Sequence, residues 1–218
     1  MNNYQVEKIV AEVIAMLNKP RSRQIPLGVS ARHCHLSLEM VEKLFGEGYK
    51  LTKKSDLSQP GQFAAEETIL IAGPKGSIDK VRVLGPARSV TQVEISKTDA
   101  RHLGLAPPVR QSGDIKNSSP VTLIGPKGSV SIPEGLIIAQ AHIHMSPSDA
   151  ENFNVTDGEL VEVKAAGSER SITFSNILIR VSERYRLEMH LDTDEANAGG
   201  LITGNKAELI KQESHYVR

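Results

Sequence analysis

The chain has 218 residues, and its 26 Lys and Arg balance its 26 Asp and Glu, so the formal net charge is zero. This balance argues against nucleic acid as a partner, because nucleic-acid-binding proteins normally carry a basic excess, and the absence of Trp argues against a base-stacking surface. The single cysteine, Cys34, excludes an intramolecular disulfide and fits a reducing compartment. Because there is neither a ~20-residue apolar run nor a secretory signal, we expect a soluble cytoplasmic protein without a membrane partner.

Residues 4–18 carry the clearest helical pattern in the chain. Apolar side chains recur at three- and four-residue steps from Val6 to Leu17 and form one stripe. We therefore assign residues 1–20 as an amphipathic helix and residues 21–24 as a linker. The pattern fits two interpretations equally: a helix packed on its own domain or at a dimer interface, and a detachable peptide that docks on another protein.

From Ile25 onward, short apolar runs alternate with Gly and Pro, which is typical of strands and turns. Short strands at this spacing predict a mainly β protein with two similar small β-barrel domains, capped by short helices. The Pro-, Ser- and Gly-rich stretch at 107–120 is the best boundary, so we place the two halves at 25–118 and 119–218, with strands exchanged between them. The polar tail from Lys206 is expected to be frayed or a short helix.

The halves look like an internal duplication. In each, a His-x-His segment is followed by a short helical segment, a pair of strands, and a strand that carries a Glu with a downstream Thr-Asp. Ser146 is a candidate N-cap for the second of these helices, with Pro147 at its first position. Both Gly-Pro-Lys-Gly loops lack the glycine spacing of a nucleotide-binding motif, and we interpret them as hairpin turns.

The strongest chemical signal is the pair of His-x-His segments, His33-Cys34-His35 and His142-Ile143-His144, each at the end of an apolar run. In a strand, residues i and i+2 share a face, so each segment directs two imidazoles the same way. Converging neutral imidazoles favour a transition-metal site. Cys34 should point to the opposite face, as a core thiol.

Further ligands are expected from the equivalent strands. Glu94 lies in an alternating strand pattern, and His190 shares a strand face with Glu188. Five histidines and one glutamate exceed one tetrahedral site, so we expect two metals, zinc or otherwise Co, Ni, Mn or Fe. At least one metal would then be unsaturated, which is typical of catalytic sites. Arg88 precedes Glu94 and could hold phosphate or carboxylate, although local sequence alone favours a surface arginine.

Five segments together resemble the PduL-type phosphotransacylases, which are phosphate propanoyltransferases of bacterial microcompartments. They are IPLGVSARHCHLS, QPGQFAAEETI, VRVLGPARSVTQVEISKTDARHLG, AQAHIHMSPSDA and RLEMHLDTDEANAGG, and they run from about Ile25 to Gly200. The resemblance implies that acyl-CoA (acetyl or propionyl) and inorganic phosphate are interconverted with acyl phosphate and CoA, on two zinc ions per chain. By the same resemblance, the N-terminal helix, joined to the rest of the chain by the linker, would be an encapsulation peptide. It would direct the enzyme into a microcompartment by binding the shell or core proteins of that compartment.

The resemblance also implies residue roles. His33 and His35 would hold one zinc, and Glu94, His142, His144 and His190 the other. Arg88 would bind the attacking phosphate. The positions that match the CoA-binding residues are Ser30, Lys54, Arg82, Leu84 and Asn197, with Lys54 in a stretch that differs in length from the family pattern. A homodimer or higher oligomer is expected. Two alternative functions stay open: a metal-dependent hydrolase, and a non-catalytic microcompartment protein whose metals only stabilise the fold.

Overall fold

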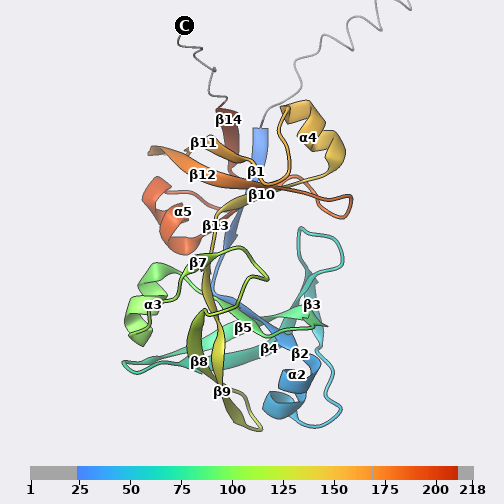
Figure 1. Ribbon diagram of the computed structural model, residues 1–218, viewed down its shortest axis with the longest axis vertical. Helices are drawn as coiled ribbons and strands as arrows, with labels where there is room; N and C mark the ends of the chain where they lie inside the picture. Colours follow the sequence, from blue (N-terminus) through green and yellow to red (C-terminus); the bar gives the residue numbers. More distant parts are fainter. Residues whose placement is uncertain (1–23, 168, 211–218) are drawn as a thin grey trace, which may run out of the picture.

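The computed structural model describes residues 24–167 and 169–210, which form two β-barrels joined end to end (Figure 1). The predicted N-terminal helix at 1–20 lies outside the described residues. The expected mainly β fold, with two similar small barrels and short helices, is confirmed.

The first barrel is a ring of six strands that closes in the order β4-β5-β2-β6-β9-β8, with short strands β3 and β7 paired to β4 and β9. Its strands are β2 (His33–Ser37), β3 (Lys53–Asp56), β4 (Phe63–Ala72), β5 (Ser77–Arg88), β6 (Gln92–Glu94), β7 (Val109–Arg110), β8 (Ser119–Ile124) and β9 (Ser129–Ala139). The two helices of this barrel are α2 (Leu38–Phe45) and α3 (Lys97–Leu103).

The second barrel closes in the order β1-β13-β10-β12-β11-β14. Its strands are β1 (Gln24–Ser30), β10 (His142–Met145), β11 (Leu160–Ala166), β12 (Ser171–Val181), β13 (Glu188–Asp192) and β14 (Lys206–Ile210). Its helices are α4 (Pro147–Phe153) and α5 (Thr193–Gly199). The tail from Lys206 therefore begins with a strand, and the expectation of a frayed or helical tail was wrong, because pairing with β1 and β11 satisfies its backbone.

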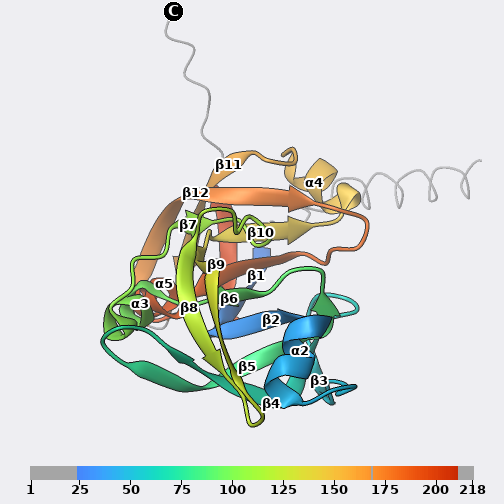
Figure 2. The ribbon, with the colours of Figure 1, turned by 60° about the horizontal axis from the view of Figure 1, so that its bottom comes forward.

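The chain crosses between the barrels twice. β1 lies in the second barrel and continues directly into β2 of the first, and β9 lies in the first barrel and continues directly into β10 of the second (Figure 2). The predicted division at 118/119 therefore does not coincide with the barrels, since β8 and β9 close the first one. The stretch at 107–120 is likewise a surface excursion of the first barrel, because β7 within it pairs with β9. Both crossings immediately precede a His-x-His segment.

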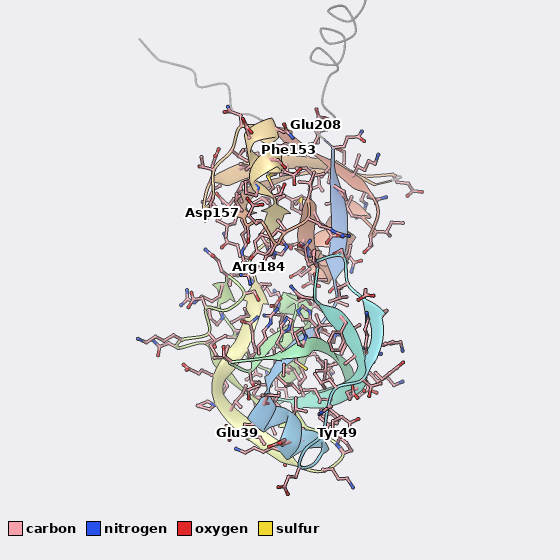
Figure 3. All side chains as sticks on the ribbon, turned by 90° about the vertical axis from the view of Figure 1, so that its right-hand side faces the viewer. Glu39, Tyr49, Phe153, Asp157, Arg184 and Glu208 are labelled. Carbon is pink, nitrogen blue, oxygen red and sulfur yellow. The ribbon has the colours of Figure 1, made fainter. Side chains whose placement is uncertain are left out.

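Each barrel has its own apolar core, and local sequence signals position the helices around it. One core is centred on residues such as Leu36 and Leu123, and the other on residues such as Ile143 and Ile179. Ser146 caps α4 with Pro147 at the start, as predicted. Figure 3 shows Phe153 of α4 in the second barrel and Glu39 of α2 in the first. In the described part of the chain, no helix is long and apolar enough to cross a membrane.

Candidate active site

The two His-x-His segments stand at the junction of the barrels, and each has a third side chain opposite it. In the ladder between β2 and β6, Glu94 lies directly across from His33, and in the ladder between β10 and β13, His190 lies directly across from His142. The potential ligand atoms of His33, His35 and Glu94 all lie within 4.8 Å of one another, and so do those of His142, His144 and His190. We call these three-residue groups the first and second ligand sets.

The crossing peptides fix the orientation of the first imidazole in each set. His33 Nδ1 lies 2.9 Å from the carbonyl oxygen of Ala31, and His142 Nδ1 lies 2.8 Å from that of Gln140. A carbonyl oxygen only accepts hydrogen bonds, so Nδ1 carries the proton and Nε2 keeps its lone pair for a ligand. This arrangement is typical of metal-binding histidines.

Other imidazole nitrogens are buried without a partner. Among the residues that the structure describes, His35 Nδ1 and His144 Nδ1, one in each ligand set, are inaccessible to solvent and make no hydrogen bond, whereas His190 Nε2 lies 3.1 Å from Glu188 Oε2. Buried polar atoms are rarely left unpaired in folded proteins, because the loss of water costs about 1–3 kcal/mol each. Unpaired nitrogens that converge in this way fit metal ions bound by both ligand sets.

The electrostatics keep most of the ligand groups in the form that binds a cation. His33 differs, because burial lowers its pKa but the charge of Glu94 and the hydrogen bond to it raise the pKa above its usual value. Burial lowers the pKa of His35 to about 3 and that of His142 to about 4, so both imidazoles are neutral at pH 7. Burial alone would raise the pKa of Glu94, but the charge of His33 and a hydrogen bond from it hold this pKa well below its usual range. His33 Nε2 lies 3.4 Å from Glu94 Oε2. Glu94 is therefore an anion at neutral pH.

Gln92 supports Glu94 from the same strand. Its amide nitrogen donates to Glu94 Oε1 at 2.5 Å and to Ser112 Oγ at 2.9 Å, while its amide oxygen accepts from the Gly113 backbone N–H at 2.7 Å. Gln92 is completely buried and lies across the ladder from His35. Sequence reasoning missed it, and the available signal was its place two residues before Glu94, on the same strand face.

Both ligand sets open into one cavity of about 610 Å³ between the barrels. Arg88 reaches it from the end of β5, where its guanidinium makes only long contacts of 3.5 Å, to Ser112 Oγ and to Gln62 Oε1. A half-buried guanidinium with free donors suits an oxyanion such as phosphate. The cavity thus brings together two candidate metal sites and one anion-binding group.

The sequence is similar over nearly its whole length to proteins of one kind. The family model described as phosphate propanoyltransferase matches residues 26–202. Proteins named phosphate propanoyltransferase are 62% identical in Priestia megaterium, over 94% of this chain and 95% of that protein, and 52% identical in Thermotoga maritima, over 93% and 95%. A third, from Salmonella typhimurium, is 51% identical over 89% of this chain and 92% of that protein. The chain belongs to the phosphate propanoyltransferase family. It is therefore an acyltransferase by family, as the resemblance implied.

Only some of the residues expected at the CoA site lie at the cavity. Ser30, Arg82 and Leu84 line the large cavity, whereas Lys54 and Asn197 are not among its lining residues. Lys54 lies on β3, and its Nζ instead pairs with Oε2 of Glu66, on β4, at 3.3 Å. Asn197 is exposed on α5. A strand-end position was readable from the sequence, but the direction of each loop and helix relative to the cavity was not.

Glu94 lies nearest to the first His-x-His segment. The resemblance implied two ligands for one zinc and four for the other, with Glu94 in the larger group, and this division stays a prediction. In the structure Glu94 is grouped with His33 and His35. The ladder register explains this grouping, because it places Glu94 directly across from His33. Cys34 is buried in the core of the first barrel, facing away from the site, as predicted.

Proposed function

We propose that this protein interconverts acyl-CoA, propionyl or acetyl, and inorganic phosphate with acyl phosphate and CoA, using two zinc ions per chain. The observation that carries the proposal is that two three-residue ligand sets and Arg88 face the same cavity. His33, His35 and Glu94 would hold one zinc, and His142, His144 and His190 the other. Bound zinc supplies a Lewis acid for the thioester carbonyl and a soft acceptor for the CoA sulfur.

The residues of the chain contribute position and charge. Arg88 would hold the phosphate beside the thioester, so that proximity supplies much of the rate. A phosphate oxygen then forms a bond to the acyl carbon, the C–S bond breaks, and CoA leaves as the thiolate. Ser30, Arg82 and Leu84 line the cavity where CoA would lie. Each set would supply three ligands to a zinc ion, which would leave room for a substrate atom as a further ligand.

Direct transfer is favoured over an acyl-enzyme intermediate. The one cysteine, Cys34, is buried in the barrel core, and burial raises the pKa of its thiol, so it is neither accessible nor ionised. An acyl group on this thiol would have to form inside a packed core. The phosphate itself is therefore the proposed nucleophile.

The test is release of the CoA thiol from acetyl-CoA and propionyl-CoA, with and without phosphate, on protein of measured metal content. We expect phosphate-dependent release with about two zinc per chain, and loss of release in His33→Ala. His102→Ala is the control, because His102 is an exposed imidazole on α3, outside the cavity. Release without phosphate would instead identify a metal-dependent hydrolase, and full metal without any release would make the metals structural.

We also propose that residues 1–20 direct the enzyme into a bacterial microcompartment. The support is the amphipathic pattern at 4–18 and the linker that follows it. Deletion of residues 1–20 should leave turnover intact while the enzyme stays outside purified shells. Loss of folding or turnover would identify a helix that packs on the enzyme. A homodimer or larger oligomer remains a prediction. Light scattering on the full-length protein and on the variant that lacks residues 1–20 would check it.

A further inference from the structure

One more arginine, Arg180, faces the cavity, and it comes from the second barrel. It lies near the end of β12, directly across the parallel ladder from His144, and it lines the cavity together with Arg88. The two guanidinium groups come from different barrels, and each lies beside a different ligand set. Arg88 lies beside the first set, where its charge lowers the pKa of His35, and Arg180 lies beside the second, where its charge lowers the pKa of His144; in both cases burial is the larger cause.

An uncharged partner holds Arg180 in place. Its Nη2 donates to the Tyr185 hydroxyl at 3.3 Å, and its guanidinium carbon lies 5.8 Å from the centroid of that ring. The Tyr185 ring in turn packs on the His144 imidazole with 4.1 Å between centroids. Arg180 is thus positioned by contacts that leave its charge unneutralised and most of its five N–H donors available.

Among the described residues, neither Arg88 nor Arg180 has a carboxylate partner at ion-pair distance. Within residues 24–167 and 169–210, Arg88 and Arg180 make no ion pair within 4.0 Å, whereas Arg32 pairs with Asp99 at 2.7 Å. Burial lowers the pKa of Arg88, the charge of Glu94 raises it, and the charge of Arg180 lowers it, so the two guanidinium charges act on each other across the cavity. Two partly buried like charges repel, and an anion bound between them would remove the repulsion.

The duplication shows that packing does not require an arginine here. Opposite His35, the equivalent position in the first barrel is held by Leu84, which faces the same cavity. A leucine therefore satisfies this barrel position, and the arginine in the second barrel points to a binding role. Arg88 itself lies four residues after Leu84, so the two arginines occupy different positions in their barrels and are not a repeated pair.

We propose that Arg180 is a second oxyanion-binding residue, which together with Arg88 holds the phosphoryl group of phosphate and of acyl phosphate between the two barrels. This inference rests on the proposed phosphate acyltransferase function. A phosphate has enough oxygens for two guanidinium groups at once, and the phosphoryl group keeps its place while its oxygen bonds to the acyl carbon and CoA thiolate leaves. Arg180 should therefore act on phosphate and acyl phosphate and leave acyl-CoA binding unaltered.

The first test measures Arg180→Gln and Arg180→Lys by steady-state kinetics in both directions. We expect the KM for phosphate and for acyl phosphate to rise about tenfold to hundredfold in Arg180→Gln, and less in Arg180→Lys, which keeps the charge but not the planar fork. The KM for acyl-CoA should stay within about twofold of the wild type. Arg184→Gln is the matched control, since Arg184 is exposed and is not among the residues that line the cavity (Figure 3).

The second test measures binding of inorganic phosphate to zinc-loaded protein by titration calorimetry, without acyl-CoA. Arg180→Gln should weaken it by the same factor as the KM, and Arg88→Gln/Arg180→Gln should weaken it by less than the product of the two single effects. Unchanged phosphate binding, or a change confined to acyl-CoA, would overturn the inference. If Arg180→Gln fails to fold or to retain zinc, phosphate binding is measured on Arg180→Lys and Tyr185→Phe instead. Weaker phosphate binding in these variants would support the inference, and unchanged binding would overturn it. A wild type without phosphate-dependent transfer would refute the proposed function itself, whereas an active wild type with unaltered variants would refute only the role of Arg180.

Discussion

Glu94 and His190 occupy equivalent positions in the two barrels, each directly across the ladder from the first histidine of its set. The fold thus repeats one arrangement of three ligand positions and fills the third with a carboxylate in one barrel and an imidazole in the other. The first set carries one negative charge and the second carries none, so the two metals should differ in the charge that they retain. A difference of this kind lets one site bind a thiolate and the other an oxyanion.

The role of Glu94 can be tested by removing its charge. Glu94→Gln should lower the metal content from about two to about one per chain and reduce turnover at least about 100-fold, because the first set loses its anionic ligand. Glu94→His, which copies the second set, should retain more metal than Glu94→Gln. Glu151→Gln, an exposed change on α4, is the control, and metal analysis after dialysis is the measurement. Two metals per chain in Glu94→Gln would exclude Glu94 as a ligand.

Gln92 should matter for metal affinity although it binds no metal itself. Its amide donates to Glu94 and to Ser112, so Gln92→Leu would leave the Glu94 carboxylate free to rotate and would remove a buried donor. We expect the affinity for zinc to fall about 10- to 100-fold, measured by competition with a chelator. Gln111→Leu makes the same chemical change at an exposed position and should have no effect. Equal affinities in the two variants would contradict the supporting role of Gln92.

Local signals were readable from the sequence, and long-range pairing was not. The His-x-His segments, the Ser146 cap and the burial of Cys34 depend on neighbours within a few residues, and the structure confirms the cap and the buried thiol. The closure of each barrel depends on pairings between distant residues, such as Leu70 with Ile124 in the first barrel and Leu27 with Met189 in the second, and no local pattern specifies them. For the same reason the approach of Arg180 to His144 could be seen only once β10 and β12 were paired.

The loop between β3 and β4 links the two barrels beside the cavity. The Gln59 amide donates to the Arg186 carbonyl oxygen at 3.1 Å and accepts from the Arg186 backbone N–H at 3.2 Å, while Ser58 donates to Glu188. Gln59 is buried, so Gln59→Ala should lower the free energy of unfolding by about 1–3 kcal/mol through the loss of its two hydrogen bonds to Arg186 and a longer one of 3.5 Å to Glu188 Oε2. Chemical denaturation would measure this, with Gln111→Ala as the exposed control. An unchanged midpoint would mean that this contact does not hold the barrels together.

Gly28 provides the space that the Glu188 carboxylate occupies. A Cβ at position 28 would lie 3.0 Å from Glu188 Cδ and 3.1 Å from its Oε1, so Gly28→Ala should push this carboxylate away from His190 and Ser58. We expect a loss of stability of about 1–2 kcal/mol and a weaker second metal site, measured by denaturation and by zinc content. Gly158→Ala does not serve as a control because its φ of 81° adds strain, so Glu151→Gln on exposed α4 is the control here too. Wild-type stability in Gly28→Ala would show that Glu188 can move at no cost.

Glu195 should make the stability of the protein depend on pH. Burial raises the pKa of this carboxyl from 4.5 to about 7, and the charges of Asp192 and Asp194 raise it further. The folded state therefore binds its proton more tightly than the unfolded state, and the associated stabilisation is fully present below pH 4.5 and is lost as the pH rises through about 7.

Glu195→Gln removes this titration while keeping an oxygen that can accept from the Asp192 backbone N–H, as Glu195 does at 2.9 Å. At pH 8 the variant should be more stable than the wild type by about 1–3 kcal/mol, and the difference should shrink toward pH 5. Urea denaturation at both pH values measures this directly. Every other side chain is the same in the wild type and the variant, so the difference between the two proteins isolates Glu195. A variant with the same pH dependence as the wild type would show that the carboxyl titrates normally, with its burial relieved by solvent at the start of α5.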